Sequence, residues 1–561
     1  IEVSVDKKNK LIKIKDKGIG MTKEEVEKYI TEIAFSGAEE FVKKFKNKAD
    51  VNIIGHFGLG FYSAFMVADK VEIFTKSYKK TAKGVHWVCE GSPEYTIEEY
   101  NKKDRGTEII LHIAEDSKEF LEEERIEQLL NKYCKFMPIS IQFGETETEI
   151  EKDGKKEKKK VPRIINNPTP AWTKKPSELK EEDYINFYRE LYPYSLEEPL
   201  FWIHLNVDYP FRLTGILYFP KIQSNLEIRK DKIQLYSNQV FVTDNVEGIV
   251  PEFLTLLHGV IDSPDIPLNV SRSGLQSDAN VKKISGYITK KVADKLAEIF
   301  KNNRKDFEEK WDNIKLFIEY GMLTDDKFFE KAEKFALYKN VEGKYFTLNE
   351  FIEKIKKTQT NKYQKTVVLY THNPDEHYTE IQQAKEKGYD VLVLDTVLTS
   401  HFITKLEQKH NDLIFSRIDA NSLDKLIEKD EKPISKLSEK EKEQLKQIFE
   451  DITDKEKFTV QLEDLSENAM PVSITEPEFL RRMREQSMLS NQPFGSNGME
   501  MYNLIVNTNH PLMSKILNEK DKEKQKEIAK QSLDLALLSK NLLKGEALNH
   551  FINRSINLIN E

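Results

Sequence analysis

Two glycine-containing motifs near the start of the chain constrain its fold most strongly, and the first is Asp16-Lys-Gly-Ile-Gly-Met21. It follows the alternating apolar segment 11–15, which predicts a strand that ends at Asp16. An ionised carboxylate only accepts hydrogen bonds, which suits the exocyclic amine of adenine. Gly18 and Gly20 let backbone approach a ring where a β-carbon would clash. We therefore expect Asp16 to recognise the base of a nucleotide.

The second motif, Gly55-His-Phe-Gly-Leu-Gly60, leads into the apolar run 61–67. Its glycines would place free backbone N–H groups at a helix N-terminus, where the helix dipole favours phosphate. A separate pair, Gly106-Thr107, opens a further predicted strand. Any one of these motifs could be a simple turn or helix cap, but their order together predicts an ATP site.

The spacing of these glycines excludes two common glycine-loop folds. A Walker loop needs Gly-Lys-Ser/Thr after its last glycine, and a dinucleotide fingerprint needs Gly-x-Gly-x-x-Gly. This chain has Gly-x-x-Gly-x-Gly with no lysine after it. The series of Asp-x-Gly-x-Gly, a lid-length insert, this loop and Gly-Thr resembles the superfamily of gyrase, chaperone, histidine-kinase and mismatch-repair ATPases.

Three segments in the middle of the chain, 169–176, 267–276 and 320–329, resemble the ninety-kilodalton heat-shock protein chaperones. The resemblance extends over essentially the whole chain and is greatest to the bacterial members. It implies a dimeric molecular chaperone that binds ATP with Mg²⁺ and acts on partly folded client proteins. Slow ATP hydrolysis would open and close a two-armed clamp.

The resemblance also implies the roles of individual residues. Arg272, from outside the nucleotide domain, would stabilise charge on the γ-phosphate. Gln276 would support the same loop or the attacking water. An arginine that caps a local carbonyl is the alternative for this segment taken alone. The expected nucleotide-binding residues are Asp16, Gly18, Gly20, Met21, Ser36, Gly37, Gly55, His56, Phe57, Gly58, Leu59, Gly60, Phe61 and Thr107.

The chain opens at Ile1, directly in a predicted strand. In this family a preceding helix carries the glutamate general base and the asparagine that helps hold Mg²⁺, so we expect both upstream of residue 1 and assign no metal ligand. Tyr29, Phe35 and His56 stand where the family usually has Asn, Lys and Gln. We expect these departures to alter nucleotide affinity or lid kinetics without loss of binding.

Composition describes a soluble, charge-rich globular protein, with 561 residues of which 39% are hydrophobic and 32% charged. The net charge of -8 argues against nucleic acid as the main partner. Cys89 and Cys134 lack metal-ligand spacing, so we interpret both as core thiols in a reducing compartment. No apolar run is long enough to span a membrane. A cytoplasmic location is expected.

We predict the α/β fold class, with an α+β sandwich ATPase domain at 1–148 and a short charged linker at 149–162. A basic nucleic-acid patch is the alternative for that linker. An α/β middle domain at 163–430 divides at about residue 320 into two subdomains. Strands are expected at 200–207, 213–219 and 239–243, helices at 281–317, and a βαβ unit over 366–394. A second charged joint at 428–440 precedes a mainly helical dimerisation domain at 431–561.

Apolar residues three and four apart over 546–559, after the run 533–538, predict a helical hairpin that ends its first helix near Gly545. At the chain terminus such a stripe would form a two-fold bundle, although packing on its own domain is the alternative. The residues expected at the dimer contact are Leu548, Phe551, Ile552 and Ile556.

Thr475-Glu-Pro-Glu478 has capping-box spacing and opens an amphipathic helix that continues to residue 489. Its methionines suit an adaptable client-binding surface, although an ordinary half-buried helix is the alternative. The residues expected to contact clients are Phe479, Met483, Met488 and, in the middle domain, Trp172.

The chain ends without the acidic pentapeptide that recruits helical-repeat co-chaperones to eukaryotic relatives, so those partners are not expected. Two other functions remain open. A DNA-processing ATPase of the same superfamily would need an acidic metal cluster or a basic channel, and neither has a clear candidate. A passive holdase would bind clients without turnover.

Overall fold

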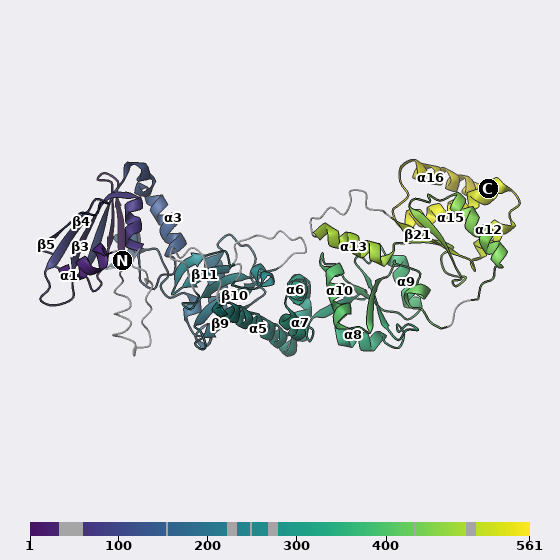
Figure 1. Cartoon of the computed structure of the whole chain (residues 1–561), viewed down its shortest axis with the longest axis horizontal. Helices are drawn as coiled ribbons and strands as arrows, with labels where there is room; N and C mark the ends of the chain where they lie inside the picture. The colour runs from purple at the N-terminus through teal and green to yellow at the C-terminus, as the bar shows by residue number, and fades with distance from the viewer. Residues whose placement is uncertain are drawn as a thin grey trace. The chain divides into compact units, whose positions relative to one another are not determined.

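The computed structural model describes residues 1–32, 60–152, 155–221, 233–246, 249–266, 279–430, 434–489 and 501–560. These residues form two compact units that divide after Val292 (Figure 1). We call them the first unit and the second unit. The division lies inside helix α5 (Ala279–Asn302), and thus within the predicted middle domain. The domain boundaries given above remain predictions.

An eight-stranded sheet with the order β5-β4-β3-β6-β2-β1-β7-β8 opens the first unit. Its core lies between the inward face of the sheet, which includes Val71 and Ile73, and helical segments that contribute Val26 and Ile126. The strands are β1 Glu2–Asp6, β2 Leu11–Lys15, β3 Ala68–Lys76, β4 Gly84–Cys89, β5 Tyr95–Tyr100, β6 Gly106–Ile113, β7 Gln142–Lys152 and β8 Lys155–Ile164. The helical segments are α1 Lys23–Val26, η1 Glu27–Thr31, η2 Gly60–Met66, η3 Glu115–Leu121 and α3 Glu123–Tyr133.

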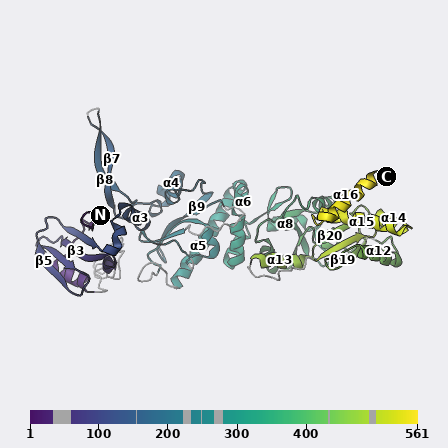
Figure 2. The same ribbon diagram turned by 90° about the horizontal axis from the view of Figure 1, so that it is seen from above.

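The segment 149–162, predicted as a short charged linker, is not an irregular loop, because β7 and β8 continue through it as a hairpin. Figure 2 shows the hairpin extending away from the rest of the sheet. Its side chains at the described positions 144–147 and 160 are exposed, and the sequence here lacks the alternation that marks a half-buried strand. Pairs of opposite charge stabilise such strands instead. Glu147 lies opposite Lys160, whose amine is 4.0 Å from the carboxylate of Glu145.

A second sheet in the first unit has the order β12-β11-β13-β10-β9. Its strands are β9 Phe201–Val207, β10 Leu213–Phe219, β11 Ile233–Ser237, β12 Val240–Thr243 and β13 His258–Asp262. The helical segments beside it are η4 Ala171–Thr173, η5 Pro176–Glu178, α4 Glu181–Leu191 and η6 Glu252–Leu256. The strands predicted at 200–207, 213–219 and 239–243 are confirmed, and with them the α/β class of this region.

Trp172 lies inside this region, and its prediction as a client contact is therefore wrong. Its side chain is 1% exposed and contacts the rings of Phe136 and Tyr236, with centroids 4.8 and 5.2 Å away. The indole Nε1 donates a hydrogen bond to Asp262 Oδ2 over 3.2 Å. Burial raises the pKa of the Asp262 carboxyl, and hydrogen bonds from Trp172 and the backbone of Gln239 oppose that shift.

The second unit begins with the end of α5, followed by α6 (Arg304–Thr324), α7 (Asp326–Ala332) and a sheet of order β15-β14-β17-β16-β18. The strands β16 and β17 are parallel and are joined by α9, which confirms the predicted βαβ unit. The remaining elements are β14 Leu337–Asn340, β15 Tyr345–Thr347, α8 Leu348–Ile355, β16 Thr366–Thr371, α9 Tyr378–Glu386, β17 Val391–Val393, α10 Thr399–Lys409, β18 Leu413–Arg417 and α11 Leu423–Leu426.

The end of the chain combines helices with a three-stranded sheet of order β19-β21-β20. The predicted helical hairpin is confirmed, but α15 ends at Ser539, before Gly545. Asn541 takes the left-handed conformation (φ 54°), and the Leu542 N–H bonds the Leu537 carbonyl, which closes the helix. The elements are α12 Glu439–Asp451, β19 Phe458–Glu463, β20 Val472–Thr475, α13 Glu478–Leu489, β21 Tyr502–Asn507, α14 Pro511–Asn518, α15 Lys522–Ser539 and α16 Gly545–Asn560.

Helix α13 forms where the sequence predicts it, but not through a capping box. The Thr475 hydroxyl is buried without a hydrogen-bond partner in the described part of the chain. Glu478 instead accepts a hydrogen bond from the Tyr370 hydroxyl at 3.0 Å and one from Arg482 at 2.7 Å. The spacing is that of a capping box, but Glu478 is the first residue of the helix, and its carboxylate is held by Tyr370 of β16 and by Arg482 one turn further along α13.

Arginines of α13 dock this helix onto the α/β sheet of the second unit. Arg481 is 2% exposed and donates to the Tyr370 hydroxyl and to Glu478, each at 2.5 Å. Arg482 reaches Glu407 at 2.8 Å and the carbonyl of Phe415 at 2.6 Å. The inner face of α13 is therefore ionic, and the charges on it are paired.

We expect Arg481→Ala to destabilise the second unit by about 3–5 kcal/mol, because it removes the buried partner of the half-buried Glu478 carboxylate. Amide hydrogen exchange in β16 measures this loss locally. Arg484→Ala is the matched control, since Arg484 lies on the same helix and pairs with Glu476 while its side chain is 39% exposed. A loss no larger in Arg481→Ala than in this control would contradict a structural role for the buried arginine.

Candidate functional site

The ends of β2 and β3 and the start of β6 meet at one place, where Asp16 lies. The Asp16 N–H donates to the Thr107 carbonyl at 2.8 Å. The carboxylate oxygen Oδ1 accepts from the Gly18 N–H at 2.7 Å and from the Thr107 N–H at 3.3 Å. The other oxygen, Oδ2, has no hydrogen-bond partner among the described residues. Asp16 thus presents one fixed, unused acceptor.

Two glycines allow the backbone to come together around Asp16. Gly20 has a positive φ of 60°, and a β-carbon there would lie 1.8 Å from the Lys76 carbonyl oxygen. Gly106 has φ 112°, and its β-carbon would lie 2.3 Å from the Asp16 carbonyl oxygen. Only glycine fits at either position without displacement of the neighbouring strand.

A pair of buried hydroxyls lies on the same strands, at Thr75 of β3 and Thr107 of β6. Thr75 and Thr107 have their Oγ1 atoms 3.0 Å apart, and the Met21 N–H donates to the Thr75 hydroxyl over 3.0 Å. Thr75 is fully buried and Thr107 is 9% exposed. The sequence motifs did not include Thr75. What marks Thr75 is that it lies opposite Thr107, in the strand that pairs with the Gly106-Thr107 strand. The pairing of these two strands is known only from the structure.

This arrangement fits a purine nucleotide. A carboxylate oxygen available as an acceptor, at strand ends that approach one another through glycines, provides the polar contact that the amine of a base needs. Within the described residues, no group of three or more His, Cys, Asp or Glu side chains could hold a metal ion. The described residues therefore fit the base of a nucleotide, and we assign no ligand for Mg²⁺ among them.

The remaining predicted nucleotide residues lie partly outside the described ranges. Met21 is half-buried against the core, and Gly60 and Phe61 open η2, where the Phe61 ring meets Trp87 at 5.7 Å. Tyr29 lies half-buried in η1. The predicted residues outside the described ranges are Phe35, Ser36, Gly37, Gly55, His56, Phe57, Gly58, Leu59, Arg272 and Gln276.

The residues predicted to contact partners differ in exposure. On α13, Phe479 is 74% exposed and Met483 is half-buried, while the side chain of Met488 lies outside the described part. On α16, Ile552 and Ile556 are 45% and 51% exposed. Leu548 is half-buried, and Phe551 is 8% exposed within the chain itself.

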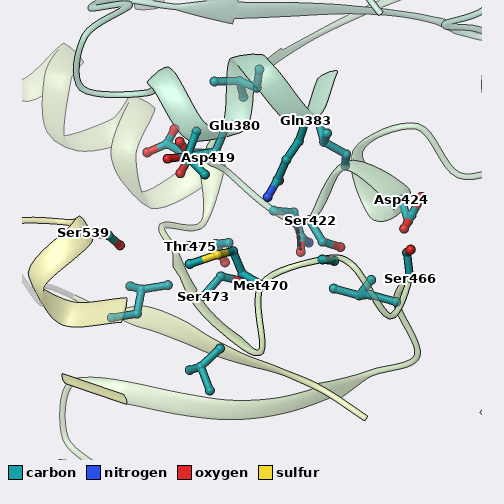
Figure 3. Close-up of a pocket in the computed structure, with 18 of the residues that line it drawn as sticks. Glu380, Gln383, Asp419, Ser422, Asp424, Ser466, Met470, Ser473, Thr475 and Ser539 are labelled. Atoms are coloured by element: carbon teal, nitrogen blue, oxygen red, sulfur yellow. Dashed lines mark hydrogen bonds between the residues drawn. The ribbon is translucent and has the colours of Figure 1, made fainter. Parts of the chain in front are cut away.

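A cavity of about 200 Å³ lies in the second unit, between α9 and the end of β18 on one side and the segment 465–475 on the other. Figure 3 shows Glu380, Asp419 and Ser422 facing this space from one side and Met470 from the other. Its lysines are already paired, since Lys540 contacts Glu380 at 2.5 Å and Lys387 contacts Asp424. We assign this cavity no ligand.

None of the described helices combines the length and the apolar character needed to cross a membrane. Both cysteines are unpaired, as expected, with Cys89 buried and Cys134 half-buried. Burial raises the pKa of the Cys134 thiol, which is consistent with a structural role for it.

Two family models match the chain. Residues 1–109 match the model described as "Histidine kinase-, DNA gyrase B-, and HSP90-like ATPase", which includes Asp16, Gly20 and Thr107. Residues 144–554 match the model described as "Hsp90 protein".

Similar proteins occur in several bacteria. The chain is 49% identical over 616 aligned residues to the chaperone protein htpG of Bacteroides fragilis, an alignment that covers 98% of this chain and 90% of that protein. It is 54% identical over 522 residues to the chaperone protein HtpG of Porphyromonas gingivalis, covering 92% and 76%. The HtpG of Clostridium acetobutylicum is 31% identical over 561 residues, covering 97% and 88%.

We expect Gly20→Ala to lower the thermal stability of the first unit. A left-handed backbone costs an L-residue about 1–2 kcal/mol, and the added methyl group would displace the loop from Lys76. Gly286→Ala is the matched control, because Gly286 lies in α5 with open space around it and no positive φ. That change should leave the melting temperature unchanged or slightly raised. Equal melting temperatures for the two variants would show that the loop at Gly20 can move away from Lys76 without a loss in the free energy of unfolding.

Proposed function

This chain belongs to the Hsp90 protein family, and we propose that it is an ATP-driven chaperone that binds and remodels partly folded proteins as a dimeric clamp. The region 1–109 is its ATPase domain. The observation that carries the proposal is the geometry of Asp16, whose carboxylate is fixed by Gly18 and Thr107 through one oxygen while the other remains an acceptor. A fixed acceptor at this place suits the amine of adenine.

We propose a separate role for each residue of the nucleotide site. Asp16 binds the base, Gly20 and Gly106 hold the strand ends together, and Thr107 completes the polar edge. Arg272 and Gln276 are proposed for the γ-phosphate on the strength of the family resemblance. ATP with Mg²⁺ supplies the free energy of phosphoanhydride hydrolysis. Its differential contacts in two conformations would shift the clamp between them.

We place the dimer contact on α16. Ile552, Ile556 and Ile559 recur at helical spacing and are 45%, 51% and 82% exposed, so they form an apolar stripe that the described chain leaves uncovered. A two-fold axis would bring this stripe against its copy. Phe551 is already buried in the chain and would support the helix from beneath.

Client contact is proposed for α13, where Phe479 is 74% exposed. Trp172 is no longer part of this proposal because it is buried. A cytoplasmic location is part of the proposal. A passive holdase with the same partner surfaces is the alternative, and ATP turnover separates the two.

We expect Asp16→Asn to abolish ATP binding while the fold is retained. The asparagine oxygen can still accept from Gly18 and Thr107, but its amide would place a donor where the amine of adenine needs an acceptor. Isothermal titration with ATP measures the change, and circular dichroism checks the fold. Normal ATP binding by Asp16→Asn would refute the assignment of the pocket. Absence of binding by the unmodified chain would favour the holdase.

We expect the double change Ile552→Asp and Ile556→Asp to convert the dimer to monomer, since it buries two uncompensated charges in the proposed interface. Sedimentation velocity measures the oligomeric state. Asn553→Asp is the control, because Asn553 is exposed on the same helix and outside the apolar stripe. A dimer that survives the double change at the same concentration would place the contact elsewhere.

A further inference from the structure

A cavity of about 650 Å³ lies in the second unit between α6, β14 and the segments that follow β16 and β17, and we call it the α6 cavity. We propose that it binds an alkyl ammonium or guanidinium group, with Glu319 as the ion-pair partner of the bound cation. The volume is in the range of small-molecule sites. Its ligand is distinct from the nucleotide proposed for the first unit.

The wall of the α6 cavity has an apolar part. Trp311, Lys315 and Glu319 lie four residues apart along α6, so they share the helix face that lines the cavity. Leu337 of β14 and Leu394, which follows β17, add apolar surface from the sheet. An alkyl chain can pack on such a wall while its charged end reaches a polar partner.

The charged side chains of the α6 cavity leave one carboxylate without an amine. The Lys315 amine is 2.7 Å from the carboxylate of Asp395 and 3.2 Å from that of Asp312. The Lys339 amine makes a longer contact of 3.5 Å with Asp312. Both lysines are therefore engaged by the two aspartates, and Glu319 carries the excess negative charge of the cavity.

The carboxylate of Glu319 is buried, with 8% of the residue exposed. Its Oε2 accepts a hydrogen bond from the Thr396 hydroxyl. Within the described part of the chain, Oε1 has no hydrogen-bond partner and the carboxylate forms no ion pair. A buried carboxylate is costly unless it is paired, so a cation that enters the cavity gains a strong partner.

The surroundings of Glu319 affect its ionisation. Burial raises the pKa of the Glu319 carboxyl to about 7. The hydrogen bond from Thr396 and the charge of Lys315 oppose this shift, and the charge of Asp395 adds to it. Tyr338 of β14 also interacts with Glu319, and burial raises the pKa of its hydroxyl, so it stays uncharged. A bound cation would favour the ionised carboxylate.

The charges of the α6 cavity argue against other classes of ligand. Among the described residues, no group of three or more His, Cys, Asp or Glu side chains could hold a metal ion. A carboxylate or phosphate ligand would be repelled by Glu319 and would meet lysines that are already paired. An ammonium or guanidinium group supplies both a positive charge and N–H donors for Oε1.

Saturation-transfer NMR of the full chain with n-butylguanidine and n-pentylamine tests the inference, because each probe carries one cation on an alkyl stem. We expect Glu319→Gln to raise both dissociation constants about tenfold, which corresponds to the loss of one charge-assisted hydrogen bond. The glutamine oxygen can still accept from Thr396, and circular dichroism checks the fold. Glu309→Gln is the matched control, since Glu309 is exposed on the same helix and does not line the cavity.

Two further measurements separate an ion pair from a merely structural role of Glu319. Lys315→Met should lower both dissociation constants, because it removes a positive charge from the wall, and it keeps the inference testable if Glu319→Gln does not fold. The carboxyl must lose its proton to pair, so both constants should fall about tenfold between about pH 6 and about pH 8. This pH dependence should disappear in Glu319→Gln.

A blocked Gly-Gly-Arg-Gly-Gly peptide distinguishes the source of the cation. Peptide binding as tight as that of n-butylguanidine would assign the cavity to a basic side chain of a partner protein, and binding of the free probes alone would assign it to a small amine. Absence of binding by both cations, tighter binding of butanoate, or equal changes in Glu319→Gln and Glu309→Gln would overturn the inference.

Discussion

A β-carbon at Gly106 would lie 2.3 Å from the carbonyl oxygen of Asp16, and one at Gly20 would lie 1.8 Å from that of Lys76. These two close approaches join the ends of β2, β3 and β6, and the candidate nucleotide site depends on them. Because the strands meet here without side chains between them, the carboxylate of Asp16 can accept from the backbone of Thr107. The glycines thus fix the geometry of the site without contributing a functional group to it.

Much of this region could be predicted from the sequence. The features that could not be predicted share a physical cause. Strand β2 and the position of Asp16 at its end were predictable, because apolar and polar residues alternate with a period of two in a half-buried strand. The partnership of Thr75 with Thr107 was not, since it depends on which strands pair and in what register. The β7–β8 hairpin was missed for a related reason, because its described side chains at 144–147 and 160 are exposed and the charged segment has no apolar pattern.

Long-range contacts also explain why Trp172, predicted as a client contact, is buried instead, and why Arg481 is buried on the helix that was predicted to face clients. Arg481 and Trp172 belong to residue types that are common on binding surfaces, yet both are buried. Arg481 of helix α13 is held by Tyr370 of strand β16, and Trp172 is held by Asp262 of strand β13. Such contacts join residues far apart in the sequence. A local pattern therefore shows that a residue can serve as a contact, but not whether the fold has already used it.

The arginines of α13 make the contacts that hold this helix on its domain, a role that apolar residues usually have in a surface helix. An ordinary surface helix buries its apolar stripe and exposes its charges. Helix α13 instead turns Arg481 and Arg482 toward Tyr370 and Glu407, while Phe479 remains 74% exposed. Ionic docking fixes such a helix through directional contacts and leaves apolar surface unused. Such an arrangement suits a partner-binding helix. The ionic contacts that hold the helix in place do not compete with the exposed apolar side chains that would bind a partner.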